Sequence, residues 1–578
     1  MNRFAQRLVR GLESPVTLWA LPLLGAAVLC GALDGGFQLD DHFQRYRLLG
    51  LGEDSMQLFV FYDGDVDSNL AEREAGTLPW WVSPKLRHAN FRYLSVLTMQ
   101  LDYLLWPHSP ALMHLHSLLW LAALVLVVTA FFRYLFRESS ARWVAGLAAL
   151  VYALDDAHVL PAGYLANRNA LLAAAFGLAS VYCHTRWREE QWRPGFWLTP
   201  LFLSLAFASG ELGVSALAYL FAYAVCLDRE GLRAASLALV PSGLVATLWM
   251  LTYRFGGFGS SDSGLYVDPG ADPLGFLSLS LDRISALLLG QWTPIPADWT
   301  VLVGPSGAGG VRAAGVLIFA GLASLLWPQR SQPLLRFFAL GSFLSLLPIA
   351  ATGPQNRLLL FVSFGAAGLL GCLAAARPSG WRRWVLVGLV AMHLTLSIAA
   401  GQIVLTFQER AARAMEVASN SVPDEGLETK ELVLVNPSDS IYLPTAVFMM
   451  RWTDGRPAPH TIRVLSHGST DVEVEGVDPN TVELELAQGL FPDAMSRYHR
   501  SSRLPFVPGD RVELEGFSAE VLEVGSTGDP TRLRYRFSSA LGREDQLWLV
   551  WNGATFERWR PPKPGETKLL PRRAGIFG

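Results

Sequence analysis

Apolar runs long enough to cross a lipid bilayer recur along the first 407 residues of this chain, and no other feature restricts its fold as strongly. A helix that crosses the bilayer needs roughly 20 mostly apolar residues, so we expect a polytopic α-helical membrane protein with about eleven transmembrane helices. Composition agrees, with 51% hydrophobic and only 17% charged residues. The runs cover residues 16–33, 113–136, 142–160, 169–187, 196–209, 212–228, 234–253, 310–327, 334–350, 356–376 and 384–407.

The distribution of arginines gives the direction of threading. Arg3, Arg7 and Arg10 precede the first run, and positive charge is retained on the cytoplasmic side, so we expect a cytoplasmic N-terminus. Every second loop should then lie in the cytoplasm and be rich in arginine. The loops follow this pattern if the apolar stretch 274–293 does not cross the membrane. We expect an interfacial or re-entrant helix there. The arginines of these loops are Arg133, Arg137, Arg142, Arg186, Arg188, Arg193, Arg229, Arg233, Arg330, Arg336, Arg377, Arg382 and Arg383.

Composition changes after Phe407, where short alternating runs separated by turn dipeptides predict a β-rich domain on the external side. We therefore predict a transmembrane domain over 1–407 with a first external loop at 34–112, a linker at 408–430 and an external β-rich domain at 431–578. The predicted strands are Val433–Val435, Thr461–Leu465, Asp471–Glu475, Val482–Leu486, Arg511–Glu515, Ala519–Val524, Arg532–Phe537 and Leu547–Trp551.

Charge argues against nucleic acid as a partner, and cysteine placement argues against disulfides or a cysteine metal site. The formal net charge is −3 and no strongly basic run occurs, so nucleic acid is not an expected partner. All four cysteines, Cys30, Cys183, Cys226 and Cys372, fall inside apolar runs. We expect them to be buried thiols rather than disulfides or a metal site.

The loops assigned to the external face carry the polar groups that could perform chemistry. Taken singly, each group has an ordinary explanation: adjacent aspartates often cap a helix or form a turn, and an arginine beside an apolar run often anchors it at the interface. Taken together, ionisable groups gathered at one membrane face indicate a functional site. The groups are Asp40-Asp41-His42, Asp155-Asp156 with His158, Asn167-Arg168, Glu211, Arg254 and Asn356-Arg357.

Several short motifs occur in the order and at the spacing of a known family. The motifs are Phe37-Gln38-Leu39-Asp40-Asp41-His42, Asn90-Phe91-Arg92-Tyr93-Leu94-Ser95, His114-Leu115-His116-Ser117, Asn167-Arg168-Asn169-Ala170-Leu171-Leu172, Ser209-Gly210-Glu211 and the segment 356–365. With them the chain resembles the membrane glycosyltransferases of the C superfold over roughly residues 15 to 407. It is most similar to the O-mannosyltransferases that carry tetratricopeptide repeats and to related bacterial transferases that glycosylate protein or lipid A.

The resemblance implies an inverting glycosyltransferase that takes its sugar from a polyprenyl-phosphate carrier. Phosphate leaves as an anion without being protonated, so such an enzyme needs one general base and cations for the phosphate. The resemblance implies Asp41, or else Asp40, as the base, and Arg357 with Arg168 or Arg254 as the phosphate clamp. Asp155, Asp156, His158 and His42 would bind or orient substrate, and Glu211 would partner an arginine.

Cofactor, acceptor and location follow the same reasoning. We expect no metal cofactor, although Asp40, Asp41 and Asp155 would suit Mg²⁺ or Mn²⁺ if they converge. The expected partners are the polyprenyl-phosphate sugar donor, membrane lipid, and a protein, lipid or glycan acceptor of the cell envelope. The expected location is the bacterial inner membrane, with the C-terminal domain in the periplasm.

Two other functions stay open at this point. A flippase of lipid-linked saccharides would also need many spans and external charges, but it predicts charged groups near mid-membrane. A non-catalytic membrane scaffold is also consistent, because Gly210 and Asn356 stand where the family tends to have Lys and Glu.

Overall fold

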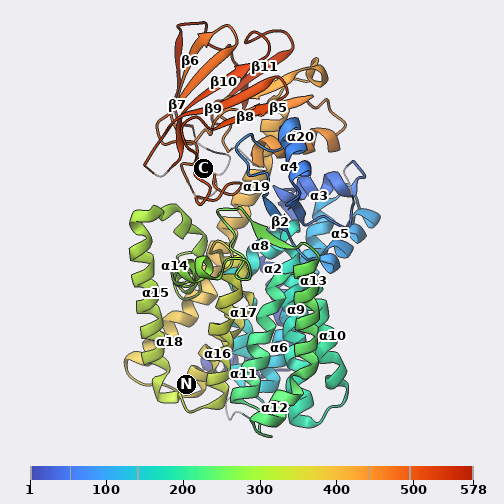
Figure 1. Ribbon diagram of the computed structural model, residues 1–578. Coiled ribbons are helices and arrows are strands. Elements are labelled where there is room, and N and C mark those ends of the chain that lie inside the picture. The colour runs from blue at the N-terminus through green and yellow to red at the C-terminus, as the bar shows by residue number, and fades with distance from the viewer. Residues whose placement is uncertain are drawn as a thin grey trace. The chain divides into compact units, whose positions relative to one another are not determined.

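The computed structural model describes residues 3–51, 54–138, 142–439, 442–493, 496–526, 528–573 and 575. The chain divides into two compact units, and each gathers segments that are far apart in sequence (Figure 1). The helical unit comprises residues 1–36, 90–258 and 269–408, and the β-rich unit comprises residues 37–89, 259–268 and 409–578.

The helical unit is a bundle around one large apolar core, in which α6 packs against α2, α7 and α9, and α16 packs against α11 and α17. Helix α19 runs on past residue 408, so its last turns belong to the β-rich unit. The helices are α1 (Arg3–Glu13), α2 (Thr17–Val28), α5 (Tyr93–Leu105), α6 (Pro110–Leu135), α7 (Trp143–Ala153), α8 (Val159–Gly163), α9 (Arg168–Glu190), α10 (Pro194–Ser209), α11 (Ser215–Cys226), α12 (Leu232–Ala238), α13 (Val240–Phe255), α14 (Pro273–Trp292), α15 (Gly304–Leu326), α16 (Pro333–Ile349), α17 (Leu360–Ala375), α18 (Trp381–Ala391) and α19 (Ser397–Ser421).

The apolar helices indicate a multi-pass membrane protein, but the number of about eleven spans is not confirmed. Among the described residues, four helices are long and apolar enough to cross a membrane, and the number rises to seven if each of three bent pairs is one span. The shortfall has a physical reason: four further apolar helices have only 10–17 residues, fewer than a straight crossing requires.

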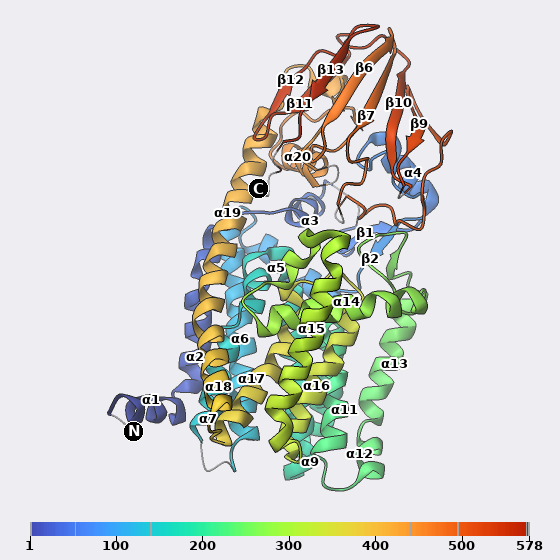
Figure 2. The same ribbon diagram turned by 90° about the vertical axis from the view of Figure 1, so that its left-hand side faces the viewer.

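Helix α14 covers the stretch that charge distribution assigns to the interface. It meets the length and apolarity of a span. However, Figure 2 shows it lying across the axes of α13 and α16, and Figure 1 shows it nearly end-on. The expectation of an interfacial or re-entrant helix stays a prediction.

The described residues of the β-rich unit form three sheets. The strand orders are β13-β6-β7-β10-β9-β8, β12-β11-β4-β5 and β1-β2-β3. The first and third sheets are antiparallel, whereas β4 is parallel to both β11 and β5. Parallel neighbours need a crossover, and α20 provides it between β4 and β5. The strands are β1 (Val60–Asp63), β2 (Arg87–Ala89), β3 (Gly259–Ser261), β4 (Glu431–Leu434), β5 (Thr461–Val464), β6 (Val472–Asp478), β7 (Thr481–Leu486), β8 (Arg511–Leu514), β9 (Phe517–Val524), β10 (Pro530–Phe537), β11 (Gln546–Trp551), β12 (Phe556–Arg558) and β13 (Thr567–Leu570), and the helices are α3 (Asp40–Leu48), α4 (Val66–Ala75) and α20 (Tyr442–Thr453).

The predicted β-rich C-terminal region is confirmed, and each of the eight predicted strands overlaps a strand of the structure, β4 to β11. Burial alternates along β6, as the pattern of apolar residues requires. The unit also includes residues of the first external loop, since Trp80 and Trp81 belong to the same apolar core as the strands. The predicted domain boundaries stay a prediction.

Candidate functional site

Helix α3 begins with the two predicted catalytic carboxylates. Leu39, the residue before them, has a φ of 36°, a left-handed value that is strained for a residue with a large side chain. Asp40 and Asp41 occupy the first turn, where the helix dipole favours negative charge. Asp41 is 2% exposed, and its Oδ2 accepts a hydrogen bond from Gln38 N at 3.0 Å. A buried acid next to backbone strain is typical of a functional site.

The same helix carries two more buried polar side chains. Burial and the positive charge of Arg45 lower the pKa of His42 to about 3, so its imidazole is neutral at pH 7. Gln44 is fully buried, and within the described part of the chain its amide has no hydrogen-bond partner. An unpaired buried polar group costs about 1–3 kcal/mol and is therefore rare in folded proteins. A buried acid, a buried imidazole and a buried amide thus share one short helix.

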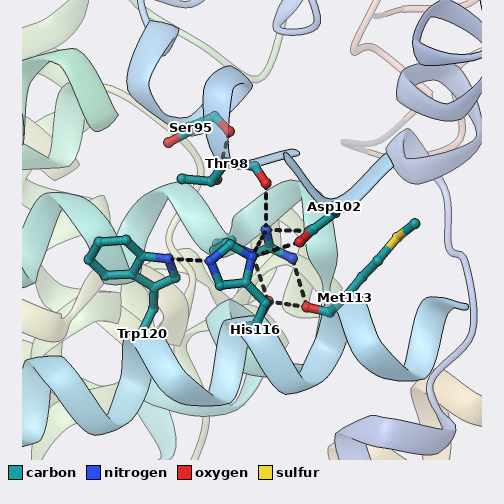
Figure 3. Close-up of polar contacts among 8 residues, drawn as sticks. Ser95, Thr98, Asp102, Met113, His116 and Trp120 are labelled. Carbon is teal, nitrogen blue, oxygen red and sulfur yellow. Dashed lines mark hydrogen bonds and ion pairs between the residues drawn. The ribbon is translucent and has the colours of Figure 1, made fainter. Parts of the chain in front are cut away.

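Arg168 lies in a separate buried network, which Figure 3 shows in close-up. Its Nη1 is 2.5 Å from Asp102 Oδ2, and the two side chains are 1% and 2% exposed. Its Nε donates to Ser117 Oγ at 2.9 Å, and its Nη2 donates to Met113 O at 2.7 Å. These contacts join α5, α6 and α9. Protein acceptors thus occupy the guanidinium of Arg168. Its role as a phosphate ligand stays a prediction.

Asp102 also holds His116 of α6. The distance from His116 Nδ1 to Asp102 Oδ1 is 2.6 Å, and Trp120 Nε1 donates to His116 Nε2 at 3.0 Å. An indole N–H can only donate, so Nε2 is the acceptor from Trp120, while Nδ1 faces both Asp102 and, at 3.2 Å, Arg168 Nη1. Figure 3 shows the three side chains in a row. Asp102 therefore contacts an arginine through one oxygen and a histidine through the other.

Asp155 is the centre of a second network at the junction of α7 and α8. Its Oδ1 accepts from Ser363 Oγ of α17 at 3.0 Å, and its Oδ2 accepts from Gln291 Nε2 of α14 at 3.3 Å. His393, in a single π-helical turn between α18 and α19, places Nδ1 3.4 Å from the same Oδ2. His158 donates from Nδ1 to the carbonyl oxygen of Asp155 at 2.9 Å. π-helical turns occur frequently at functional sites.

Asn356 links this network to the start of α17. Its Nδ2 donates to Asp156 Oδ2 at 2.8 Å, and its backbone N donates to Asp298 Oδ2 at 2.9 Å. Burial raises the pKa of Asp298, so the neighbourhood disfavours negative charge. A glutamate at position 356 would face two carboxylates, whereas an amide donates to one of them. Arg357 follows directly, is half-buried, and donates from Nε to Gln355 Oε1 at 2.6 Å.

Glu211 and Arg254 lie apart from these two networks in their contacts. Glu211 accepts from Phe91 N at 2.8 Å through Oε1 and pairs with Arg92 Nε at 3.0 Å through Oε2. Glu211 thus forms an ion pair with Arg92. Arg254 is exposed near the end of α13. Their roles toward a substrate stay predictions.

The structure therefore sorts the predicted residues into groups. One network of the helical unit contains Asp155, Asp156 and His158, together with Asn356, which precedes Arg357. Arg168 and Glu211 belong to other networks. Asp40, Asp41 and His42 lie on α3 of the β-rich unit. The joint action of the two sets stays a prediction.

Sequence reasoning missed Asp102, Asp298, Gln291 and His393 as members of these networks. A usable signal existed for Asp102 and His393, since each is an ionisable residue inside an otherwise apolar stretch. Nothing in the local sequence marks Gln291 or Asp298.

The residues that the structure describes include no group of three or more His, Cys, Asp and Glu side chains arranged to hold a metal ion. The expectation of a reaction without a metal cofactor stays a prediction.

Comparison with known proteins gives one described likeness. No family model matches the chain, and no curated protein matches it. Five solved chains match, one of them the oligosaccharyltransferase of Archaeoglobus fulgidus, crystallised with a tethered acceptor peptide that contains the NVT sequon. The identity is 13% and the TM-score is 0.35, over 78% of this chain and 64% of that one. This chain therefore spans less than two thirds of that protein, and at this similarity we assign neither activity nor substrate from it.

Proposed function

We propose that this chain is an inverting membrane glycosyltransferase. It transfers a sugar from a polyprenyl-phosphate carrier to a protein, lipid or glycan acceptor of the cell envelope. The single observation that carries the proposal is the acid pair that opens α3 behind a strained Leu39, with Asp41 buried and Asp40 half-buried. The proposed setting is a bacterial inner membrane, with the chemistry on the external face and the β-rich C-terminal domain in the periplasm.

The chemistry follows from the leaving group. The acceptor hydroxyl must lose a proton as it attacks the anomeric carbon, and one carboxylate suffices because the departing phosphate needs no proton. Asp41 is our choice of base, because it is the more buried of the two acids and its carboxyl group is oriented by the hydrogen bond that it accepts from Gln38 N. Asp40 is the second choice. A single displacement of this kind inverts the anomeric configuration.

Cations must stabilise the phosphate as it leaves, and guanidinium suits this task. Arg357 and Arg254 are the better candidates. Arg357 is half-buried beside the polar network of Asp156 and Asn356, and Arg254 is exposed. Arg168 is less suited, because recruiting it would leave Asp102 buried without its partner.

The test is release of polyprenyl phosphate from a panel of polyprenyl-phosphate sugars supplied with crude envelope acceptor. Purified wild type is compared with Asp40→Asn, Asp41→Asn and, as a matched control, Asp67→Asn, which alters an exposed acid of the same unit. We expect turnover that Asp41→Asn or Asp40→Asn abolishes and that Asp67→Asn leaves intact, with equal melting temperatures. Turnover that is indifferent to both substitutions would retain an enzyme and reject this site.

A flippase of lipid-linked saccharides is the second candidate, and one observation favours it. Asp155 and His393 place two ionisable side chains, each 3% exposed, inside the helical unit, and buried ionisable groups in membrane proteins often mark transport pathways. Proteoliposomes that translocate a fluorescent lipid-linked sugar without releasing polyprenyl phosphate would select this function over transfer.

A further inference from the structure

Helix α3 is attached to α20, although nearly 400 residues separate them in the sequence. Arg45, one turn after Asp41, donates from Nη1 to Thr453 Oγ1 at 2.9 Å and to Asp454 Oδ1 at 3.0 Å. Thr453 Oγ1 in turn donates to the carbonyl oxygen of Met450, so its lone pairs face Arg45. The end of α20 thus holds the guanidinium through two acceptors.

Apolar contacts support the same attachment. Leu39 packs against Met415 of α19 and Met450 of α20, so the strained residue before the acid pair is itself held by C-terminal segments. The rings of Tyr46 and Trp452 lie 5.3 Å apart. Arg45 also lies over the Phe37 ring, with its Cζ 5.1 Å from the centroid. Arg45 therefore contacts Phe37, which precedes the acid pair, as well as the end of α20.

The chain that follows α3 is fixed to the C-terminal strands as well. Gly76 has a φ of 81°, and a Cβ built on it would lie 1.8 Å from Ile462 O of β5, so only glycine fits there. Arg463 donates from Nη1 to Glu74 O at 2.7 Å, and Glu515 N donates to Glu74 Oε1 at 2.6 Å. The first loop is therefore anchored at α4 independently of α3.

A third set of contacts closes the loop at its far end. Trp80 packs against the rings of Phe506 and Tyr535, with centroids 5.8 Å and 5.9 Å away. Arg500 donates from Nη1 to Trp81 O at 3.2 Å. Residues 37–89 are thus built into the same folded unit as the C-terminal strands along most of their length.

From these contacts we propose that the C-terminal domain is the positioning frame of the α3 acid pair, and that Arg45, Thr453 and Asp454 are positioning residues for it. This inference rests on the proposed function for the role of Asp40 and Asp41. It gives the domain a task other than sugar binding: fixing the place of the general base. A misplacement of about 1 Å in a reacting group can lower a rate by about a hundredfold, so the frame matters for turnover.

The experiment uses the full chain in detergent and breaks the attachment without touching the acids. The test variants are Arg45→Ala and Asp454→Ala, and Arg45→Asp combined with Asp454→Arg restores an ion pair of reversed polarity. The matched control is Glu513→Ala, which breaks the Arg511–Glu513 pair of β8. Asp454 and Glu513 are 46% and 63% exposed, so neither substitution should prevent folding. Amide hydrogen exchange of residues 41–49 and the kcat and KM for the lipid-linked sugar are measured in each.

We expect exchange in α3 to rise at least about threefold in both single variants, and to stay at the wild-type rate in Glu513→Ala. We expect kcat to fall about tenfold or more with KM within about twofold of wild type, because the base and not the donor site is displaced. The double variant should recover both readouts. Unchanged α3 exchange in the single variants would overturn the proposal, as would raised exchange with an unchanged kcat. A wild type without turnover would reject the proposed function alone, since the exchange measurement would still test the frame.

Discussion

Arg168 and Asp102 make a sharp prediction at the scale of single residues. Their ion pair is almost fully buried, so removal of one partner leaves an uncompensated charge. We expect Arg168→Met to lower the free energy of unfolding in detergent by about 3–5 kcal/mol, and Arg168→Met with Asp102→Asn to recover part of that loss. A variant Arg168→Met that unfolds like wild type but no longer turns over the donor would instead identify Arg168 as a phosphate ligand.

Gly76 provides a second test at this scale. An added Cβ would meet the backbone oxygen of Ile462, whereas at Gly509, whose φ is 94°, it would meet nothing within 4 Å. We expect Gly509→Ala to cost only the left-handed penalty of about 1–2 kcal/mol, and Gly76→Ala to cost clearly more. The comparison is made by melting the β-rich unit. Equal costs for the two substitutions would show that α4 does not depend on its close approach to β5.

At the scale of elements, the sequence predicts what is local and misses what is tertiary. Strands β6 and β7 were predictable because their apolar residues alternate and turn residues separate them. Helix α20 and the short strands β1, β2 and β3 were not predicted, because they carry no periodic pattern that spans several turns or residues. The acid pair was found from its charge, but its attachment to Thr453 and Asp454 joins residues about 400 positions apart, which no local pattern encodes.

The β6–β7 ladder makes a prediction of its own. Glu473 and Glu485 are direct partners in the antiparallel register, and both are exposed. Like charges opposite each other destabilise a sheet, and opposite charges stabilise it by about 0.2–1 kcal/mol. We expect Glu473→Lys to raise the stability of the β-rich unit by about that amount in low salt, with roughly half the gain for Glu473→Gln and a smaller gain in 1 M salt. A fall in stability, or a gain that salt does not reduce, would contradict this account of the pair.

At the scale of the whole molecule, the β-rich unit is assembled from three separate chain segments. Strand β2 from the first loop pairs with β3, which lies in the segment 259–268 between α13 and α14. The C-terminal segment then contacts both, since Ser501 N donates to Asp262 O at 2.8 Å and the hydroxyl of Tyr498 contacts His88 Nδ1 at 2.5 Å. The β-rich unit is thus closed by contacts between segments that are far apart in the sequence, which composition along the chain does not encode.

Buried histidines of this unit predict how its stability depends on pH. Burial lowers the pKa of His499 to about 3, and burial with the charge of Arg45 lowers that of His42 to about 3. Both imidazoles are therefore neutral in the folded unit, while the unfolded chain takes up protons below about pH 6.5. Because the unfolded state then binds more protons, stability falls as pH decreases from about 6.5 towards 3, by up to about 1.4 kcal/mol per pH unit for each histidine.

The measurement is the free energy of unfolding of the β-rich unit between about pH 7.5 and about pH 4.5. Over this range the histidine of the unfolded chain takes up a proton, whereas the buried histidine of the folded unit stays neutral. His499→Gln keeps a side chain that can hydrogen-bond the Tyr62 hydroxyl, which His499 Nε2 contacts at 3.0 Å, and removes the titration. We expect this variant to reduce the slope below pH 6.5 by up to about 1.4 kcal/mol per pH unit, with little change near pH 7.5. His460→Gln is the control, because His460 is exposed, and it should leave the slope unaltered. If His499→Gln and wild type lose stability in parallel as the pH falls, His499 is not held neutral in the folded unit, and the acid sensitivity must come from other groups.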